Sequence, residues 1–197
     1  KRYSMSNGEI DNIYERGETG APKSLVILLH GLGSNGRDLI SLAPYFETEL
    51  PGTAFISPDA PFACDMVPPG YPDSYQWFSM LDRDPHKILE GVQRAAPVLQ
   101  NFIAQQIEKY GVPANKVALV GFSQGTMMSL HVAPRYPEKL AGVLGYSGAL
   151  VREPGPQAMP VRLIHGQADD VVPVEAYAHA RSRLESAGFD VSGHTTP

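Results

Sequence analysis

The sequence predicts an α/β protein with a mainly parallel, twisted sheet and helices on both faces. Short, almost entirely apolar runs end in turn residues, and segments with helical spacing separate them. Such continuous apolar runs are typical of parallel strands that crossover helices bury on both sides. The expected strands are 23–30, 53–60, 116–122, 139–148, 161–166 and 189–195.

Four segments between these strands have the pattern of helices. In 84–110, apolar residues recur every three or four positions and form one stripe. Pro97 lies within that stripe and predicts a kink or break, because proline has no N–H to donate and its ring clashes with the preceding turn. The expected helices are 36–50, 84–110, 123–136 and 172–188.

Length and composition indicate one globular domain over residues 1–197. The chain is 43% hydrophobic and contains no repeat or linker, and no apolar run approaches the roughly 18 residues of a membrane span. A net charge of -5 without a Lys/Arg stripe argues against a nucleic-acid partner. The single cysteine, Cys64, excludes an internal disulfide and is compatible with the cytoplasm. Residues 1–8 lack the apolar segment of a secretory signal.

The segment 61–80 breaks the regular alternation. It contains four prolines and several aromatic residues, among them Tyr71, Tyr75, Trp77 and Phe78. A loop of this length is often functional, and these rings would suit the wall of an apolar substrate pocket. The alternative is a surface excursion that Trp77 anchors to the core.

Ser123 lies between two glycines where an apolar strand turns into a helix. A turn tight enough to push its side chain out of the sheet crowds the positions two before and two after, and these are Gly121 and Gly125. This pattern is typical of a nucleophile elbow, in which the serine hydroxyl sits at a helix N-terminus that favours developing negative charge. The alternative is a structural Gly-Ser turn.

A nucleophilic serine needs amide donors for the oxyanion. The glycine-rich segment 30–38 follows the first long apolar strand, at the sheet edge where Ser123 is expected. The N–H groups of Leu32 and Gln124 are the predicted oxyanion hole. A plain glycine-rich turn is the alternative, whereas a phosphate-binding loop is disfavoured because the Lys-Ser/Thr ending is missing.

An acidic residue is expected to orient the base, and 165–173 provides two. Both Asp169 and Asp170 follow the strand 161–166, in the chain order serine, aspartate, histidine of α/β enzymes with this elbow. From the residues alone, either carboxylate fits. The one that is not catalytic is expected to cap the following helix.

Five motifs together resemble the phospholipase/carboxylesterase family, a group of small α/β-hydrolases that includes bacterial carboxylesterases and acyl-protein thioesterases. The resemblance runs from about Lys23 to the end of the chain and implies an α/β-hydrolase fold. It also implies that Asp169, the third residue after the His-Gly pair, is the catalytic aspartate. The motifs are Gly-Phe-Ser-Gln-Gly at 121–125, His-Gly-Leu-Gly at 30–33, Pro-Asp-Ala-Pro at 58–61, Gln-Trp-Phe at 76–78 and His-Gly-Gln-Ala-Asp at 165–169.

The base is the member of the triad that the sequence does not settle. His30 and His165 are interpreted as shaping their loops, and His131 lies about 12 Å along the helix from Ser123, beyond hydrogen-bond reach. His86 and His179 fit solvated helix faces.

His194 follows the aspartate but falls inside the last expected strand, whereas the family's base follows that strand. We therefore expect the base and a closing helix beyond Pro197, so that the C-terminal part of the fold is missing from this chain. His194 is the alternative base.

These observations predict a serine hydrolase that transfers acyl groups without a metal or organic cofactor. The resemblance implies the substrate class: carboxylic esters with short to medium acyl chains, and also thioesters or lysophospholipids. Two other interpretations are a non-catalytic ligand-binding protein on the same scaffold and a flavodoxin-like or dinucleotide-binding domain, which would need a phosphate loop. The sequence predicts no oligomeric state.

Overall fold

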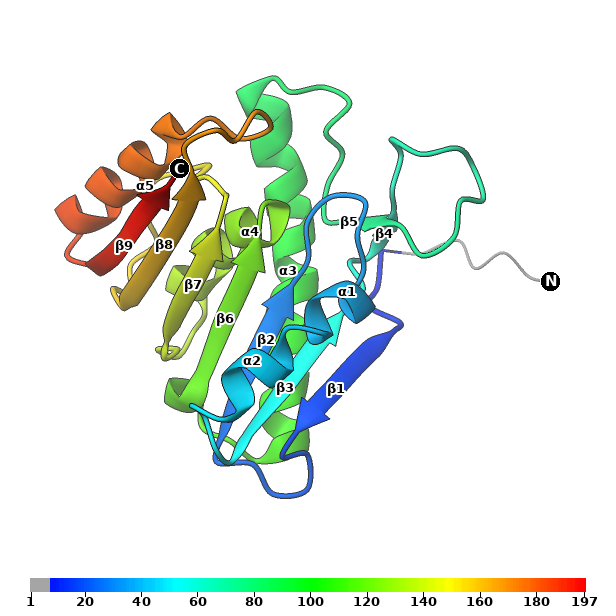
Figure 1. Cartoon of the computed structure of the whole chain (residues 1–197), viewed down its shortest axis with the longest axis vertical. Coiled ribbons are helices and arrows are strands. Elements are labelled where there is room, and N and C mark those ends of the chain that lie inside the picture. Colours follow the sequence, from blue (N-terminus) through cyan, green and yellow to red (C-terminus); the bar gives the residue numbers. More distant parts are fainter. Residues whose placement is uncertain (1–7) are drawn as a thin grey trace.

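The computed structural model describes residues 8–197 and confirms the α/β class. Its main sheet has seven strands in the order β1-β3-β2-β6-β7-β8-β9, and every neighbouring pair is parallel except β1 with β3 (Figure 1). A separate two-stranded sheet joins β4 (Phe62–Ala63) to β5 (Tyr75–Gln76). The strands of the main sheet are β1 (Ile13–Gly17), β2 (Ser24–Leu29), β3 (Thr53–Pro58), β6 (Val117–Phe122), β7 (Gly142–Tyr146), β8 (Pro160–Gly166) and β9 (Asp190–Thr196).

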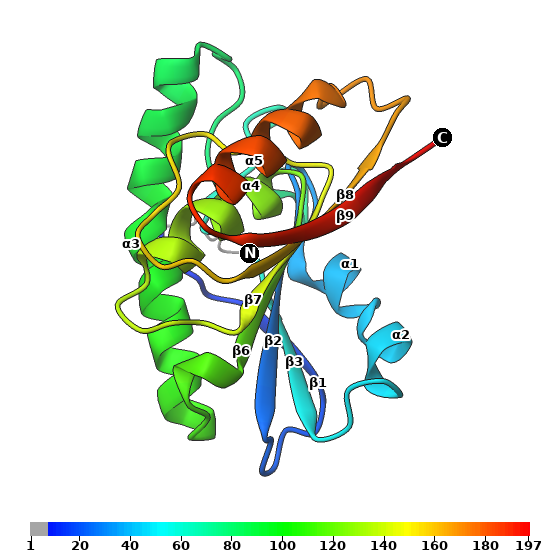
Figure 2. The same ribbon diagram turned by 90° about the vertical axis from the view of Figure 1, so that its left-hand side faces the viewer.

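Helices cover both faces of the sheet. Three of them, α3 (Pro85–Tyr110), α4 (Gln124–Val132) and α5 (Glu175–Ser186), lie on one face, and the shorter α1 (Gly36–Ile40) and α2 (Ala43–Glu47) lie on the other (Figure 2). The larger apolar cluster fills the space under α3, α4 and α5, while a smaller one lies beneath α1 and α2. The arrangement expected from the sequence, a mainly parallel sheet with helices on both faces, is confirmed.

Two helix expectations need correction. Of the kink or break expected at Pro97, the break is wrong, because α3 runs without interruption for 26 residues. The centre of its apolar stripe, which includes Val92, Leu99 and Ile103, is fully buried. This burial outweighs the one backbone hydrogen bond that proline cannot make. The single helix expected at 36–50 is instead the pair α1 and α2, and Pro44 lies in the first turn of α2.

The strand β1 was not expected from the sequence. Its sequence, Ile13–Gly17, lacks the continuous apolar run that identifies the inner strands, because a strand that is mostly exposed needs few apolar side chains. It is an edge strand, and its antiparallel pairing with β3 is a backbone interaction that side-chain patterns do not reveal.

The carboxyl ends of β2, β6 and β8 meet at one edge of the sheet, as parallel strands require. The segments that follow these strands carry the predicted site residues. Within residues 8–197, none of the helices combines the length and apolar character needed to cross a bilayer. The expectation about a secretory signal concerns residues that, apart from Gly8, lie outside the described part of the chain.

Candidate active site

Ser123 occupies a strained turn between β6 and α4. Its φ of 54° is positive, a conformation that non-glycine residues rarely adopt and that often marks a functional site. The neighbouring glycines make the turn possible: a Cβ at Gly121 would overlap the backbone of Thr126 and Gly125, and one at Gly125 would overlap the Leu29 carbonyl. The side chain of Ser123 remains partly exposed.

Hydrogen bonds hold this turn in place. The Ser123 N–H donates to the Tyr146 carbonyl at the end of β7 (2.9 Å), and the Ser123 carbonyl accepts from the N–H groups of Thr126 and Met127 (3.0 and 3.1 Å). The backbone at the serine is therefore fixed on both sides, which is how a strained conformation persists.

The predicted oxyanion segment packs against this turn. A Cβ at Gly31 would lie 3.2 Å from the Phe122 carbonyl oxygen and 3.3 Å from the Ser123 Cβ, so a larger residue would require the serine turn to shift by a few tenths of an ångström. Within residues 8–197, the N–H of Leu32 has no protein acceptor. The N–H of Gln124 lies in the first turn of α4, where amides have no partner inside the helix. The structure thus brings together the two segments that carry the predicted donors.

His30 supports the oxyanion segment from the interior. Its Nε2 accepts a hydrogen bond from the Ala60 N–H (2.9 Å), so Nδ1 carries the proton and donates to the Gly31 carbonyl (2.7 Å). Burial lowers the pKa of His30, which keeps the ring neutral in this arrangement. The indole N–H of Trp77 donates to the His30 carbonyl (3.1 Å).

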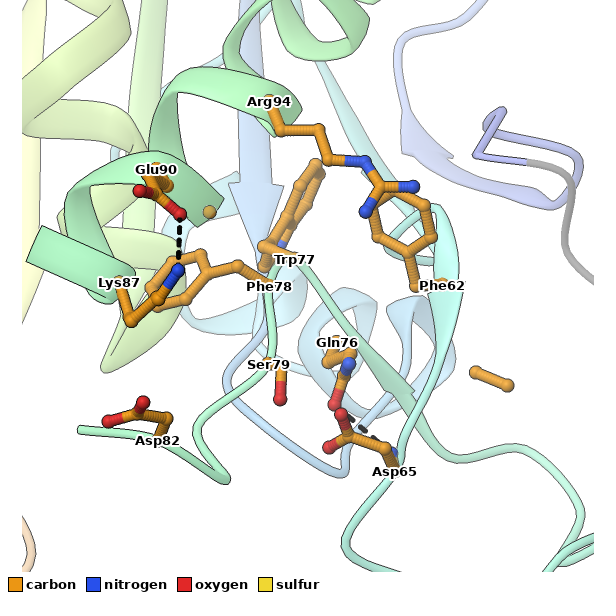
Figure 3. Close-up of a pocket in the computed structure, with 12 residues that line it drawn as sticks. Phe62, Asp65, Gln76, Trp77, Phe78, Ser79, Asp82, Lys87, Glu90 and Arg94 are labelled. Atoms are coloured by element: carbon orange, nitrogen blue, oxygen red, sulfur yellow. Dashed lines mark hydrogen bonds and ion pairs between the residues drawn. The ribbon is translucent and has the colours of Figure 1, made fainter. Parts of the chain in front are cut away.

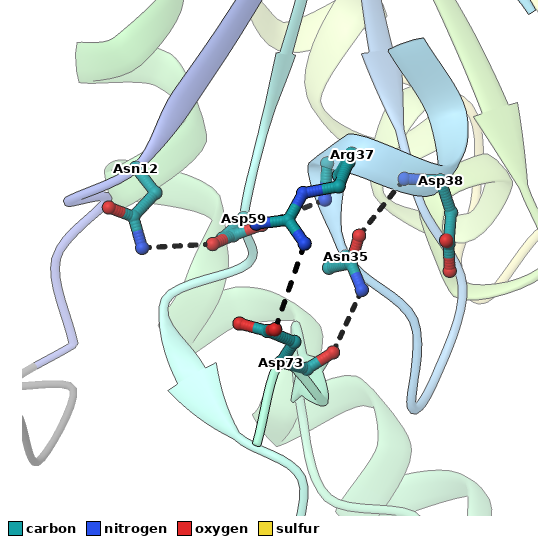
Figure 4. Close-up of polar contacts among 7 residues, drawn as sticks. Asn12, Asn35, Arg37, Asp38, Asp59 and Asp73 are labelled. Carbon is teal, nitrogen blue, oxygen red and sulfur yellow. Dashed lines mark hydrogen bonds and ion pairs between the residues drawn. The ribbon is translucent and has the colours of Figure 1, made fainter. Parts of the chain in front are cut away.

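A network of polar side chains holds the C-terminal end of the segment 30–38 in place (Figure 4). Asn35 caps α1 and donates from its side-chain amide to the Asp73 carbonyl (2.8 Å). The buried carboxylate of Asp59 accepts from the N–H of Gly36 (2.8 Å) and from the side chain of Asn12 (3.0 Å). The Asp59 of the Pro-Asp-Ala-Pro motif is therefore a brace for the loop, a role that the sequence did not indicate.

Asp169 lies in the segment after β8, with its side chain 17% exposed. Its Oδ1 accepts from the N–H groups of Val171 and Val172 (both 2.9 Å), and the bond from Val172 is the main cause that lowers the pKa of the carboxyl. The expectation that the other aspartate caps the next helix is wrong. Asp170 is exposed, and the N-cap of α5 is Val174, which makes no side-chain cap.

Two residues that sequence reasoning had not assigned to the site support Asp169. His165 is 2% exposed, donates from Nε2 to the Val172 carbonyl (2.7 Å) and lies 3.7 Å from Asp169 Oδ2. Ser147, the residue after β7, has a positive φ of 49°. Its side chain is a minor cause of the lowered pKa of Asp169, after the N–H groups of Val172 and Val171. A serine directly after a buried strand at the same sheet edge is the one sequence signal that points to Ser147.

The histidines do not supply an evident base. Among residues 8–197, His165 is the one histidine in contact with Asp169, and it is buried and already bonded to a carbonyl. His131 is buried in α4, where desolvation lowers its pKa to about 4. His194 lies inside β9, paired with Ile164, as the sequence suggested. His86 and His179 are exposed on helices, as expected.

Trp77 lines a cavity of about 560 Å³ between the segment 61–80 and the first half of α3 (Figure 3). The aromatic lining consists of Trp77, Phe78 and Phe62. The expectation that Tyr71 and Tyr75 also line the pocket is wrong: both are outside the lining, and Tyr71 is 60% exposed. Trp77 itself is fully buried, so it also anchors the segment to the core. Ser123 does not line this cavity. Trp77 connects this cavity to the predicted oxyanion hole. It lines the cavity, its backbone N–H donates to the side chain of Gln124, and its indole N–H donates to the His30 carbonyl.

Comparisons with known proteins agree with this geometry. A model of the phospholipase/carboxylesterase family matches residues 16–197. An esterase of Escherichia coli, YpfH, is 29% identical over 86% of this chain and 72% of its own length, and acyl-protein thioesterase 1 of Schizosaccharomyces pombe is 31% identical over 78% and 71%. The crystal structure of esterase PE8 superposes with a TM-score of 0.84, at 39% identity, over 95% of this chain and 89% of that one. The chain belongs to the phospholipase/carboxylesterase family of α/β-hydrolases.

Proposed function

We propose that this hydrolase is a serine carboxylesterase that cleaves small carboxylic esters through an acyl-enzyme on Ser123. The observation that carries the proposal is the strained, partly exposed serine pressed against the glycine loop that holds Leu32. A strained backbone at a reachable nucleophile, beside unpaired amides, fits acyl transfer better than a structural turn.

The proposed reaction has two steps. The Ser123 Oγ bonds to the ester carbonyl carbon and its proton passes to a base, while the N–H groups of Leu32 and Gln124 stabilise the tetrahedral oxyanion. The alcohol leaves with the proton that the base returns. Water then attacks the acyl group by the same route, and the acid leaves with Ser123 restored.

Asp169 is proposed to orient the base and stabilise its charged form. Its lowered pKa keeps the carboxylate ionised, as this role requires. We assign the base to no histidine of residues 8–197, because His165 is committed to Val172 and His194 lies within a strand. Replacement of His194 by Gln is accordingly expected to leave kcat within about twofold of the parent protein.

A fluorophosphonate probe tests the proposal. We expect the protein to be labelled and to hydrolyse p-nitrophenyl acetate, and Ser123→Ala to lose both properties. The matched control is Ser41→Ala, an exposed serine next to α1, which should behave as the parent. Absence of labelling in the parent would favour a non-catalytic binding protein, and labelling that survives in Ser123→Ala would place the nucleophile elsewhere.

Thioesters are the second candidate substrates, because the Schizosaccharomyces pombe relative is an acyl-protein thioesterase. The same acyl-enzyme would serve both substrates, so the comparison is one of rates. Measuring kcat/KM for matched oxygen and thiol esters of the same acyl group decides which class the protein prefers.

A further inference from the structure

The side chain of Gln124 is almost fully buried, at 1% exposure, and it makes two hydrogen bonds to consecutive backbone groups. Its Oε1 accepts from the N–H of Trp77 (3.1 Å), and its Nε2 donates to the carbonyl of Phe78 (2.8 Å). The orientation of the amide follows from these partners, since a backbone N–H only donates and a carbonyl only accepts. Gln124 thus fastens the segment after β5 to the serine turn.

The same segment is also fastened to the loop that carries Leu32. The Gly33 N–H donates to the Tyr75 carbonyl (2.8 Å), and the Tyr75 N–H donates to the Ser34 carbonyl (2.9 Å). The Trp77 indole N–H adds the bond to the His30 carbonyl (3.1 Å). Residues 75–78 therefore bridge the two stretches of chain that hold the proposed oxyanion donors.

We propose that the Gln124 side chain is a positioning residue, which acts through Trp77 to set the Leu32 amide at the correct distance from the Gln124 amide. The inference rests on the proposed function. Oxyanion donors stabilise a transition state only when they are held within about 0.5 Å of the productive geometry. Gln124 would then have two roles in the oxyanion hole. Its backbone N–H is one donor, and its side chain positions the other donor, the N–H of Leu32.

The critical variant is Gln124→Met, which keeps the length and the backbone N–H of residue 124 but removes both side-chain hydrogen bonds. The experiment measures kcat and KM for p-nitrophenyl acetate with the full protein, per active site titrated by the fluorophosphonate. We expect kcat to fall by about 10- to 100-fold with KM within about twofold, because the oxyanion contact is made only in the transition state.

Gln106→Met is the matched control, because Gln106 is also buried but lies on α3 and lines no part of the site. A purely structural role for Gln124 would lower the fraction of titratable sites and leave kcat per site unchanged. Trp77 is the sole tryptophan of the chain, so its fluorescence reports on the link itself. We expect a red shift and stronger acrylamide quenching in Gln124→Met and neither change in the control.

Trp77→Phe tests the other end of the link, since it removes the bond to the His30 carbonyl and leaves Gln124 intact. We expect kcat per site to fall in this variant too, and the double variant to lose less than the product of the two single losses. If Gln124→Met fails to fold, Trp77→Phe decides alone. A kcat per titrated site within twofold of the parent in the deciding variant overturns the inference. Failure of the proposed function is recognised separately, as activity retained by Ser123→Ala.

Discussion

The two sides of the candidate site are built differently. The nucleophile side, residues 30–34 and 121–125, combines backbone hydrogen bonds with close packing that leaves no room for a Cβ at Gly121 or Gly125. The acid side, residues 166–172 with Ser147, is an exposed turn held by hydrogen bonds to the Asp169 carboxylate. The difference teaches that replacing a glycine on the nucleophile side should cost stability, whereas substitutions on the acid side should cost activity with little change in stability.

The largest expected effect on the acid side is that of Asp169→Asn. The asparagine preserves the size of the side chain but cannot stabilise a protonated base, so we expect kcat to fall by about 10³- to 10⁴-fold. Asp170→Asn is the matched control, because Asp170 is exposed and outside this hydrogen-bond set. Equal activity in the two variants, measured with p-nitrophenyl acetate, would show that Asp169 is not the orienting acid.

On the nucleophile side, Gly125→Ala should destabilise the fold by about 3 kcal/mol or more, because its Cβ would overlap the Leu29 carbonyl. Gly166→Ala makes the comparison on the acid side: its Cβ would meet only the Thr196 hydroxyl, at 4.0 Å. We expect this second change to stay within about 0.5 kcal/mol of the parent. Urea unfolding measures both, and similar losses would contradict the contrast between the two sides.

Two groups should affect stability in different pH windows: His131, in the helix that follows the nucleophile side, and Asp169 on the acid side. The folded pKa of His131, about 4, is below the ordinary 6.5, so the folded state binds its proton less readily than the unfolded chain. Stability from this residue is fully present above pH 6.5 and is lost as the pH falls toward 4. The pKa of Asp169 is also lowered, but from 3.8, so its contribution is lost only in stronger acid.

The contribution of His131 can be measured from the free energy of unfolding in urea at pH 7 and at pH 5. We expect the parent to lose about 1–2 kcal/mol over this interval through His131, and His131→Leu to lose correspondingly less. His179→Leu is the control, because His179 is exposed on α5. An identical pH dependence in all three proteins would mean that His131 does not carry the effect.

The smallest expected effect belongs to Ser147→Ala. It removes a hydroxyl that helps to lower the pKa of Asp169 and leaves the hydrogen bonds from Val171 and Val172, so we expect kcat to fall by about two- to fivefold. Stability should barely change, as for other changes on the acid side. A loss as large as that of Asp169→Asn would show that Ser147 contacts the reacting groups directly.

The sequence predicted those parts of the fold and site that side-chain pattern determines. Apolar runs located the inner strands, and the spacing of Gly121 and Gly125 located the turn at Ser123, because sterics at those positions permit little else. The edge strand β1 was missed, since its pairing is made by backbone groups. The expected break at Pro97 failed because burial of the α3 stripe dominates a local preference.

Contacts between distant segments were out of reach of the sequence. The bonds from Gln124 to Trp77 and Phe78 join residues 46 and 47 positions apart, and no local pattern encodes them. The helix cap expected of Asp170 was wrong for the same reason. Two adjacent aspartates look equivalent in the sequence, whereas in the structure Asp169 alone of the two receives the N–H groups of Val171 and Val172.

The most direct test of the central claim is to identify the residue that carries the acyl group during turnover. The protein is mixed with p-nitrophenyl acetate, quenched in acid while the ester is in excess, digested and examined by mass spectrometry. We predict one acetyl group on the peptide that contains Ser123, with none in Ser123→Ala. Hydrolysis that proceeds with an unmodified Ser123, or with the acetyl group on another residue, would contradict the account.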